Sequence, residues 1–269
     1  MKITRDDPRG RVATHHRSGD GTARIGYPIG VRAVAVVRRE LVSPRMIRLT
    51  LAGPELKGFH TYQADDHVMI VFPDDDGTVR APVPNEKQEL DWPRPLPPGR
   101  KYTIRRYDPD SLELDLDFVL HEGGVASTWA ANAQPGDTVV IAGPPGAHAF
   151  AHNFDHYVFA VDTTALPAVA RWLDESPADV SADVIVEVSH EEETRYPVAE
   201  RAGVRIQWLI RPAGRSLLVD AVDALEIPAG RVFYFGAGEA DDIRPLRHRG
   251  TDRLITGYWK RGSADHDDD

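Results

Sequence analysis

The chain has 269 residues, enough for two domains at roughly 100–200 residues each. Its net charge of −10 disfavours binding to nucleic acid, whose phosphates require a basic surface, and it has no apolar run long enough to span a membrane. The chain has no cysteine, which excludes disulfides, thiolate metal sites and dithiol redox chemistry, so any electrons must travel on a bound organic cofactor and a reducing cytoplasm is the expected compartment.

The first half of the chain has the pattern of a β-barrel. Residues 1–27 are polar, lack the apolar core of a secretory signal, and are predicted to form a flexible arm. From residue 28 to 149, apolar residues mostly alternate with polar ones, most clearly over residues 112–120, which is typical of an antiparallel sheet or barrel. We also expect a proline-rich surface loop over residues 82–99, a helix over 126–133 and a strand over 138–142.

The second half has the pattern of an α/β domain, predicted over residues 150–263. Short continuous apolar runs at 156–161, 182–188, 204–210 and 231–235 are typical of strands buried on both faces of a parallel sheet. Helical patterns at 165–173 and 217–225 lie between them, so the order favours a doubly wound sheet. The predicted fold class is therefore a two-domain protein, an antiparallel β-barrel followed by a parallel-sheet α/β domain. Residues 264–269 are predicted to be an acidic tail.

A candidate flavin site lies directly after the proline-rich loop, at residues 100–105. A flavin needs a cation for its pyrophosphate, an aromatic face for its ring system and a hydrogen-bonding group near its reactive nitrogen. Alternation places Arg100 and Tyr102 on one face of a strand, and Thr103 can reach the ring through its backbone or hydroxyl. From these six residues alone, a strand with a half-buried tyrosine and solvated arginines fits equally well.

A second candidate site is the glycine turn that leads into Ala126, Ser127 and Thr128. Such a turn places backbone N–H groups and two hydroxyls at the start of a helix, which is an anion site suited to a pyrophosphate. The alternative is that Ser127 or Thr128 only caps the helix. Both interpretations can hold together.

Several motifs in order along the chain carry a family resemblance. The pattern R-x-Y-T-x-R matches Arg100, Tyr102, Thr103 and Arg105. Further segments resemble family motifs at residues 117–121 (D-F-V-x-H), 124–130 (G-P-A-S-x-W-A), 135–137 (P-G-D), 143–146 (G-P-x-G), 162–168 (D-T-T-A-L-P-A for D-E-T-A-L-P-A), 238–240 (the G-E-A of A-G-E-A) and 257–262 (G-Y-W-x-x-G). With this set the chain resembles the siderophore-interacting protein family, the FAD-dependent ferric-siderophore reductases related to ferredoxin reductases.

The resemblance implies three groups of binding residues. FAD is expected at Arg100, Tyr102, Thr103, Arg105, Asp117, Val119, His121, Gly124, Ala126, Ser127 and Thr128. NADPH or NADH is expected at Asp162, Thr163, Thr164, Gly238, Glu239 and Ala240, and an anionic ferric siderophore at Lys57, Lys260 and Arg261. The chain departs from the family pattern in having Val125 in place of a proline, and its segment between Glu239 and Gly257 is short, which predicts a stunted helix.

The resemblance also implies a mechanism. A flavin takes a hydride from NAD(P)H and can release electrons singly, and reduction of Fe(III) to Fe(II) loosens an oxygen-ligand chelate, so iron is released. No catalytic side chain and no structural metal are expected, and the default assembly is a monomer. Two alternatives stay open: a general flavin or ferredoxin-type NAD(P)H oxidoreductase, and a protein that binds flavin or siderophore without turnover.

Overall fold

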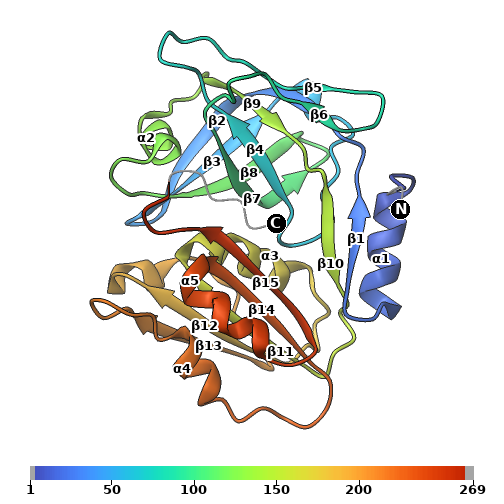
Figure 1. The fold of residues 1–269 in the computed structure, drawn as a ribbon, viewed down its shortest axis with the longest axis vertical. Coiled ribbons are helices and arrows are strands. Elements are labelled where there is room, and N and C mark those ends of the chain that lie inside the picture. The colour runs from blue at the N-terminus through green and yellow to red at the C-terminus, as the bar shows by residue number, and fades with distance from the viewer. Residues whose placement is uncertain (1–3, 264–269) are drawn as a thin grey trace. The chain divides into compact units, whose positions relative to one another are not determined.

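The computed structural model describes residues 4–263, so the predicted acidic tail at 264–269 lies outside the described residues. The chain forms two compact units, whose elements are labelled in Figure 1. The first unit holds the chain up to Ala13 and residues 24–149, and the second holds residues 14–23 and the chain from Phe150 onward. Across the described residues, no helix has the length and apolar character needed to cross a membrane.

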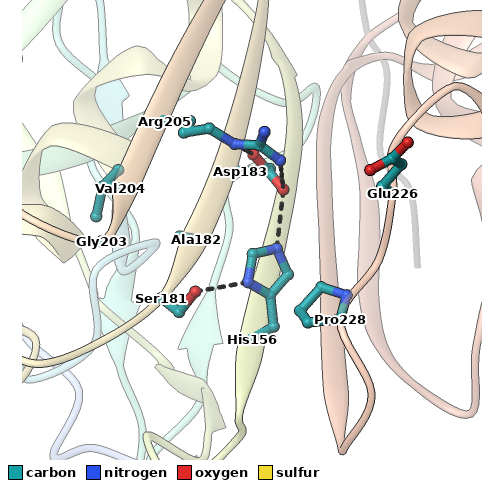
Figure 2. A pocket seen from close by; sticks show the side chains of 9 residues that line it. All are labelled: His156, Ser181, Ala182, Asp183, Gly203, Val204, Arg205, Glu226 and Pro228. Atoms are coloured by element: carbon teal, nitrogen blue, oxygen red, sulfur yellow. Dashed lines mark hydrogen bonds and ion pairs between the residues drawn. The ribbon is translucent and has the colours of Figure 1, made fainter.

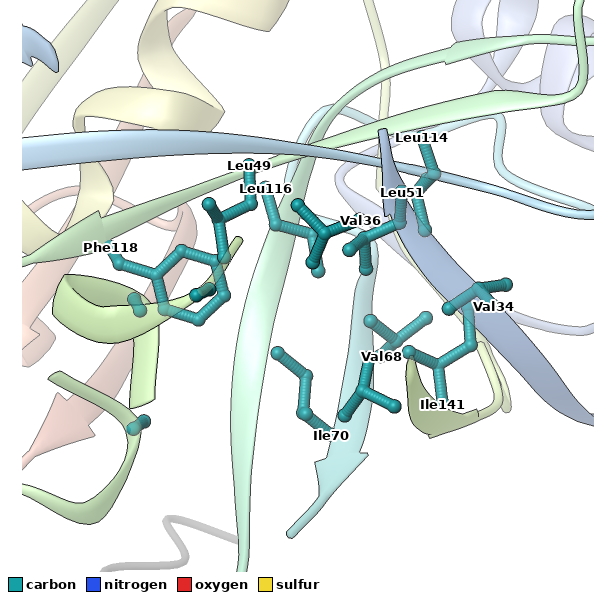
Figure 3. Close-up of a cluster of buried hydrophobic side chains, with 14 of the residues drawn as sticks. Val34, Val36, Leu49, Leu51, Val68, Ile70, Leu114, Leu116, Phe118 and Ile141 are labelled. Carbon is teal, nitrogen blue, oxygen red and sulfur yellow. The ribbon is translucent and has the colours of Figure 1, made fainter. Parts of the chain in front are cut away.

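The first unit is a closed antiparallel barrel with the strand order β2-β3-β8-β7-β4-β9. Alternate side chains of each strand fill its interior, among them Leu49, Leu116 and Phe118, which are fully buried and appear in Figure 3. The predicted barrel is therefore confirmed. Its strands are β2 (Val31–Ser43), β3 (Met46–Ala52), β4 (His67–Val71), β7 (Gly99–Asp108), β8 (Glu113–Val119) and β9 (Thr138–Ala142).

Shorter elements complete the first unit. The proline-rich segment is mostly loop, with one small hairpin of β5 (Val83–Pro84) and β6 (Leu90–Asp91). The 3₁₀ helix η1 (Pro54–Leu56) follows β3, and the predicted helix after β8 is α2 (Val125–Asn132). A separate pair of strands joins β1 (Thr22–Gly26) to β10 (Gly146–Phe150).

The predicted flexible arm at residues 1–27 needs correction, because it contains β1 and a helix, α1 (Pro8–Ser18). Only Pro8 and Val12 of α1 are buried, and the sequence lacks the helical repeat of apolar residues that signals an amphipathic helix. The arm is held instead by distant backbone groups: the guanidinium of Arg5 donates to the carbonyl oxygen of Pro145 at 2.9 Å. Contacts between residues so far apart in sequence have no local signature.

The second unit is a five-stranded parallel sheet with the order β13-β12-β11-β14-β15, as the predicted α/β domain requires. Its strands are β11 (His156–Asp162), β12 (Ala182–Val188), β13 (Val204–Ile210), β14 (Val232–Glu239) and β15 (Asp252–Trp259). Between them lie η2 (Thr163–Ala165), α3 (Leu166–Glu175), η3 (Glu191–Arg195), α4 (Leu218–Asp223), α5 (Ala240–Ile243) and η4 (Arg244–His248). The shortness of α5 and η4 matches the stunted helix expected there.

One strand prediction in the second unit is wrong in detail. The run at residues 204–210 does form a strand, β13, but β13 is not buried on both faces, because it lies at the edge of the sheet. Its side chains alternate between half-buried and exposed, as in Val204 and Arg205. The apolar character of the run correctly predicts a strand, but it does not predict that the strand lies at the edge of the sheet.

Candidate functional site

Strand β7 carries the first group of predicted flavin residues: Arg100, Tyr102, Thr103 and Arg105. The ring of Tyr102 packs on the barrel core, with its centroid 4.2 Å from that of Phe118. Burial raises the pKa of Tyr102, although the charge of Arg100 acts in the opposite direction. The phenol therefore stays protonated at neutral pH and can donate a hydrogen bond. Thr103 is almost fully buried, whereas both arginines are half-buried.

The same strand is strongly basic. Besides Arg100 and Arg105 it carries Lys101, which is exposed, and Arg106. Arg106 is directed to the carboxylate of Asp115 on the neighbouring strand, with its Nε 2.7 Å from Asp115 Oδ2. Because the other three cations flank Tyr102 in sequence, β7 combines positive charge with an aromatic ring, which are the two groups that a flavin with its pyrophosphate requires.

The family resemblance also assigns Asp117 and Val119 of β8 to the FAD site. Arg48 stands opposite Asp117 in the β3–β8 register and donates two hydrogen bonds to its carboxylate, at 2.7 and 2.8 Å. The Asp117 side chain has no exposed surface. Since Phe118 faces the barrel interior, Asp117 and Val119 lie on the opposite face of the strand. Asp117 thus takes part in a structural ion pair.

Ser127 fastens the end of β8 to helix α2. Its Oγ donates to the carbonyl oxygen of His121 at 2.8 Å and accepts from the backbone N–H of His121 at 2.9 Å. Ser127 is 3% exposed, whereas His121 is exposed, so the contact is buried on the side of Ser127. The hydroxyl that the sequence offers as a phosphate donor is therefore engaged in holding the corner, and only the backbone N–H of Ser127 is left for that role.

The start of α2 keeps the character of an anion site. Gly124 is the N-cap, and no side chain accepts a hydrogen bond from the first amides of the helix, which include that of Ala126. A Cβ atom at Gly124 would lie 2.2 Å from the ring of His121, so no larger residue fits there without movement. The side chain of Thr128 is exposed. Uncapped amides and a nearby hydroxyl suit a phosphate group.

Taken together, the residues of the first unit fit a flavin dinucleotide. Cationic β7 and the protonated phenol of Tyr102 suit the ring system and its charges, and the uncapped start of α2 suits the pyrophosphate. The ring of Trp129 in α2 lies 5.8 Å from that of Phe118, which also contacts Tyr102. This chain of aromatic contacts ties α2 to β7 through the barrel core.

In the second unit, the carboxylate of Asp162 organises the ends of three neighbouring strands. Its Oδ1 accepts from the backbone N–H and the hydroxyl of Thr164, at 2.8 and 2.5 Å. Its Oδ2 accepts from the backbone N–H of Glu239 at 3.0 Å and from the indole Nε1 of Trp259 at 2.7 Å. Burial raises the pKa of Asp162 despite these donors. The side chain is therefore occupied with holding the loops, whereas Thr163 is half-buried at the same edge.

Glu239 holds the next loop in a similar way. Its Oε2 accepts from the backbone N–H groups of Asp241 and Asp242, both at 2.9 Å, and its Oε1 accepts from that of Arg261 at 3.0 Å. Gly238 before it has φ of 150°, and a Cβ there would lie 2.6 Å from the Asp162 carboxylate. Ala240 opens the short helix α5. These contacts fix the backbone at the carboxyl ends of β11 and β14, where open α/β sheets bind ligands.

The cations predicted to hold a siderophore do not lie in a purely basic surface. Lys260 Nζ is 3.9 Å from Asp241 Oδ2, and Arg261 Nη2 is 3.1 Å from Asp242 Oδ2. Lys57, in the first unit, is exposed directly after η1. The sequence predicts a binding role for the three cations but does not reveal the acidic partners of two of them.

Comparison with known proteins assigns the family. The "siderophore-interacting FAD-binding domain" family matches residues 35–148, and the "siderophore-interacting protein" family matches residues 154–262. The chain belongs to the siderophore-interacting protein family. Its barrel is the FAD-binding domain of that family, and the predicted resemblance and cofactor FAD are confirmed.

Other members of the siderophore-interacting protein family match nearly the whole chain. A ferric vibriobactin reductase of Vibrio cholerae is 32% identical over 88% of this chain and 90% of its own length. An NADPH-dependent ferric-chelate reductase of Escherichia coli is 34% identical over 84% and 89%. The crystal structure of a siderophore utilization protein from T. fusca has 35% identity and a TM-score of 0.85, and covers 91% of this chain and 98% of that one.

Proposed function

We propose that the protein is an FAD-dependent reductase that passes electrons from NADPH or NADH to a ferric siderophore and thereby releases Fe(II). The observation that carries the proposal is the combination, within one unit, of the cationic strand β7, the protonated phenol of Tyr102 and the uncapped start of α2. Family membership and the two relatives named for ferric reduction support it. NADPH is the first donor to test, because the Escherichia coli relative is named for it.

When bound, FAD accepts a hydride from a nicotinamide and gives up its electrons singly to a metal. The chain contributes binding and orientation. Arg100 and Arg105 supply positive charge, Tyr102 supplies an aromatic face and a hydrogen-bond donor, and the amides at the start of α2 together with the Thr128 hydroxyl bind phosphate oxygens. His121 and Gly124 shape the turn that presents these amides. No side chain has to act as a general acid or base.

We assign the nicotinamide nucleotide to the carboxyl ends of β11 and β14. Thr163 and the backbone of Gly238 are the groups that we expect to contact it, because the side chains of Asp162 and Glu239 hold the loops through their own hydrogen bonds. The acceptor is a ferric complex with oxygen ligands, and many such complexes are anionic. We assign Lys57, Lys260 and Arg261 to its electrostatic attraction.

The proposal is tested by the visible spectrum of the purified protein under argon. Flavin absorbance that bleaches with NADPH or NADH and returns when a ferric siderophore is added, while a ferrous chelator gains colour, is the expected result. Arg100→Ala should weaken FAD binding, whereas Arg38→Ala, which removes an exposed cation of β2, should not. A protein that FAD cannot turn yellow would refute the flavin site.

Two further outcomes separate the alternatives. Bleaching by NADPH without Fe(II) formation from any ferric siderophore would favour a general flavin or ferredoxin-type oxidoreductase. A bound flavin that no nicotinamide nucleotide bleaches would favour a binding protein or another electron donor. The compartment and assembly belong to the same proposal: a cysteine-free protein suits the reducing cytoplasm, and a monomer is the state that sedimentation is expected to give.

A further inference from the structure

A second site lies in the α/β unit, at the opposite end of the sheet from Asp162 and Glu239. There an open pocket of about 400 Å³ is formed by the first residues of β11, β12 and β13 and by the segment after α4. Figure 2 shows its polar wall, in which the His156 ring lies between Ser181 and Asp183. Neither the flavin nor the nicotinamide assignment uses these residues.

The polar wall has the order of a hydroxyl, an imidazole and a carboxylate. Ser181 Oγ is 2.9 Å from His156 Nδ1, and His156 Nε2 is 3.0 Å from Asp183 Oδ2. Arg205 donates two hydrogen bonds to the Asp183 carboxylate, at 2.7 and 2.9 Å. Burial alone would raise the pKa of Asp183, but the bonds from Arg205 and His156 outweigh it and lower the pKa. The carboxylate is therefore ionised and can only accept.

The direction of each hydrogen bond follows from the ionised carboxylate. Because Asp183 accepts, Nε2 of His156 carries the ring hydrogen, and in the neutral ring Nδ1 has a lone pair that accepts from the Ser181 hydroxyl. A hydroxyl that donates to an imidazole, itself oriented by a carboxylate, is the arrangement of a nucleophilic serine. Relative to serine proteases, in which the carboxylate holds Nδ1, the two ring nitrogens have exchanged partners.

The fold explains why this group is assembled. In the parallel register Tyr157 pairs with Ala182 and Val158 with Asp183, so the strand starts place His156, Ser181 and Asp183 together. Helix α4 has only six residues and covers the apolar part of this sheet face, near Val158. The strand starts beyond it carry polar side chains, and His156 and Asp183 are 4% and 3% exposed. Of these three polar residues, Ser181 is the one that is half-buried rather than buried, and it lies on the pocket wall.

We propose that Ser181 is a nucleophile for acyl transfer from small carboxylic esters, activated by His156 and Asp183. Ser181 Oγ attacks the ester carbonyl carbon while His156 Nδ1 takes the hydroxyl proton. The tetrahedral adduct then expels the alcohol, which leaves with that proton, and an acyl-serine remains. Water, deprotonated by His156, releases the carboxylic acid and restores the hydroxyl, so no oxidant or reductant is involved.

The pocket also indicates the class of ester. Asp183 and Glu226 bring two negative charges against the single positive charge of Arg205, so anionic esters are disfavoured and neutral or cationic ones are favoured. The volume of about 400 Å³ suits a small molecule.

The first experiment labels the full-length protein with a fluorophosphonate and maps the adduct by peptide mass. We expect one adduct per chain, on Ser181, and a burst of one equivalent of nitrophenol from 4-nitrophenyl acetate. Ser181→Ala should abolish both, His156→Gln should slow labelling at least tenfold, and Ser189→Ala, which removes an exposed hydroxyl at the other end of β12, should change neither. Absence of the adduct, or equal labelling of the His156→Gln protein, overturns the proposal.

A second measurement does not depend on the His156 variant folding. Because the chain has no cysteine, Ser181→Cys introduces a single thiol, which iodoacetamide alkylates only as thiolate. We expect its alkylation to rise with pH at least one unit below that of the Ser189→Cys control, whose thiol should titrate near about 8.5. Equal midpoints would mean that His156 does not activate position 181. Flavin bleaching by NADPH should be the same in all these variants, so these experiments test acyl transfer independently of the reductase proposal.

Discussion

Replacement of Ser127 by alanine tests the corner that joins β8 to α2. The Ser127 hydroxyl makes two hydrogen bonds to the backbone of His121, at 2.8 and 2.9 Å, in a position that is 3% exposed. Alanine removes both and leaves the N–H and C=O of His121 without this partner. At about 1 kcal/mol for each bond, the FAD-free protein should lose about 2 kcal/mol of stability.

The measurement is urea unfolding of the FAD-free protein, followed by titration with FAD. Thr128→Ala is the matched control, because its hydroxyl is exposed and one position further along the same helix. We expect it to change the stability of the FAD-free protein by less than about 0.5 kcal/mol. If its hydroxyl binds phosphate, it should nevertheless weaken FAD binding about fivefold, equivalent to about 1 kcal/mol.

The two variants therefore separate a structural from a binding role. Ser127→Ala should weaken FAD binding as well, but only together with the loss of stability, because the turn at Gly124 is no longer fixed. If the Ser127→Ala protein unfolds at the wild-type urea concentration, the two hydrogen bonds do not hold the corner and the reasoning is refuted.

Three further variants test titratable side chains in buried or partly buried positions. Arg48→Met leaves the Asp117 carboxylate buried without its main partner and should cost roughly 3–5 kcal/mol of stability in urea, which Asp117→Leu in the same protein should largely restore. Burial and two neighbouring histidines lower the pKa of His152 to about 3. Because this pKa is below the unfolded value of about 6.5, the stability that the neutral His152 ring contributes is fully present above pH 6.5 and is lost as the pH falls. The His152→Phe protein should accordingly lose about 2 kcal/mol less than wild type between pH 7 and pH 5, and an unchanged pH profile would contradict this. Asp162→Asn removes two of four acceptor contacts and should cost about 2 kcal/mol of stability. Since burial raises the pKa of Asp162, wild type loses stability as the pH rises above the unfolded value of about 4 and asparagine does not, so the difference should shrink with rising pH; a difference that grows would contradict the raised pKa.

Local patterns predicted much of the fold. The alternation over residues 112–120 contains β8, and the strand expected at 138–142 matches β9. The helix expected at 126–133 differs from α2 by one residue at each end. Strand and helix periodicities are properties of neighbouring residues, so they can be read without knowing what lies across the sheet.

The remaining features depend on partners that are distant in sequence. Asp117 is identifiable as part of an ion pair only when the β3–β8 register places Arg48 opposite it. Helix α1 lacks an apolar repeat, and Pro8 and Val12 are its only buried residues. From the sequence, the hydroxyl of Ser127 is a possible hydrogen-bond donor to a phosphate. Its two hydrogen bonds with the backbone of His121, which only the structure reveals, give it a structural role instead.

Two cations assigned to the siderophore, Lys260 and Arg261, also have partners that are distant in sequence. Lys260 and Arg261 face Asp241 and Asp242, but both cations are largely exposed, with 42% and 56% of their side-chain surface accessible. Exposed ion pairs contribute at most about 1 kcal/mol, so a multiply charged anion can take over these cations at little cost. Arg211 differs, because it binds the almost fully buried carboxylate of Glu187 as well as Asp242, and removing it from that carboxylate would leave a buried charge uncompensated. Arg211 therefore stabilises the carboxyl edge of the sheet, whereas Lys260 and Arg261 remain available to an anionic ligand.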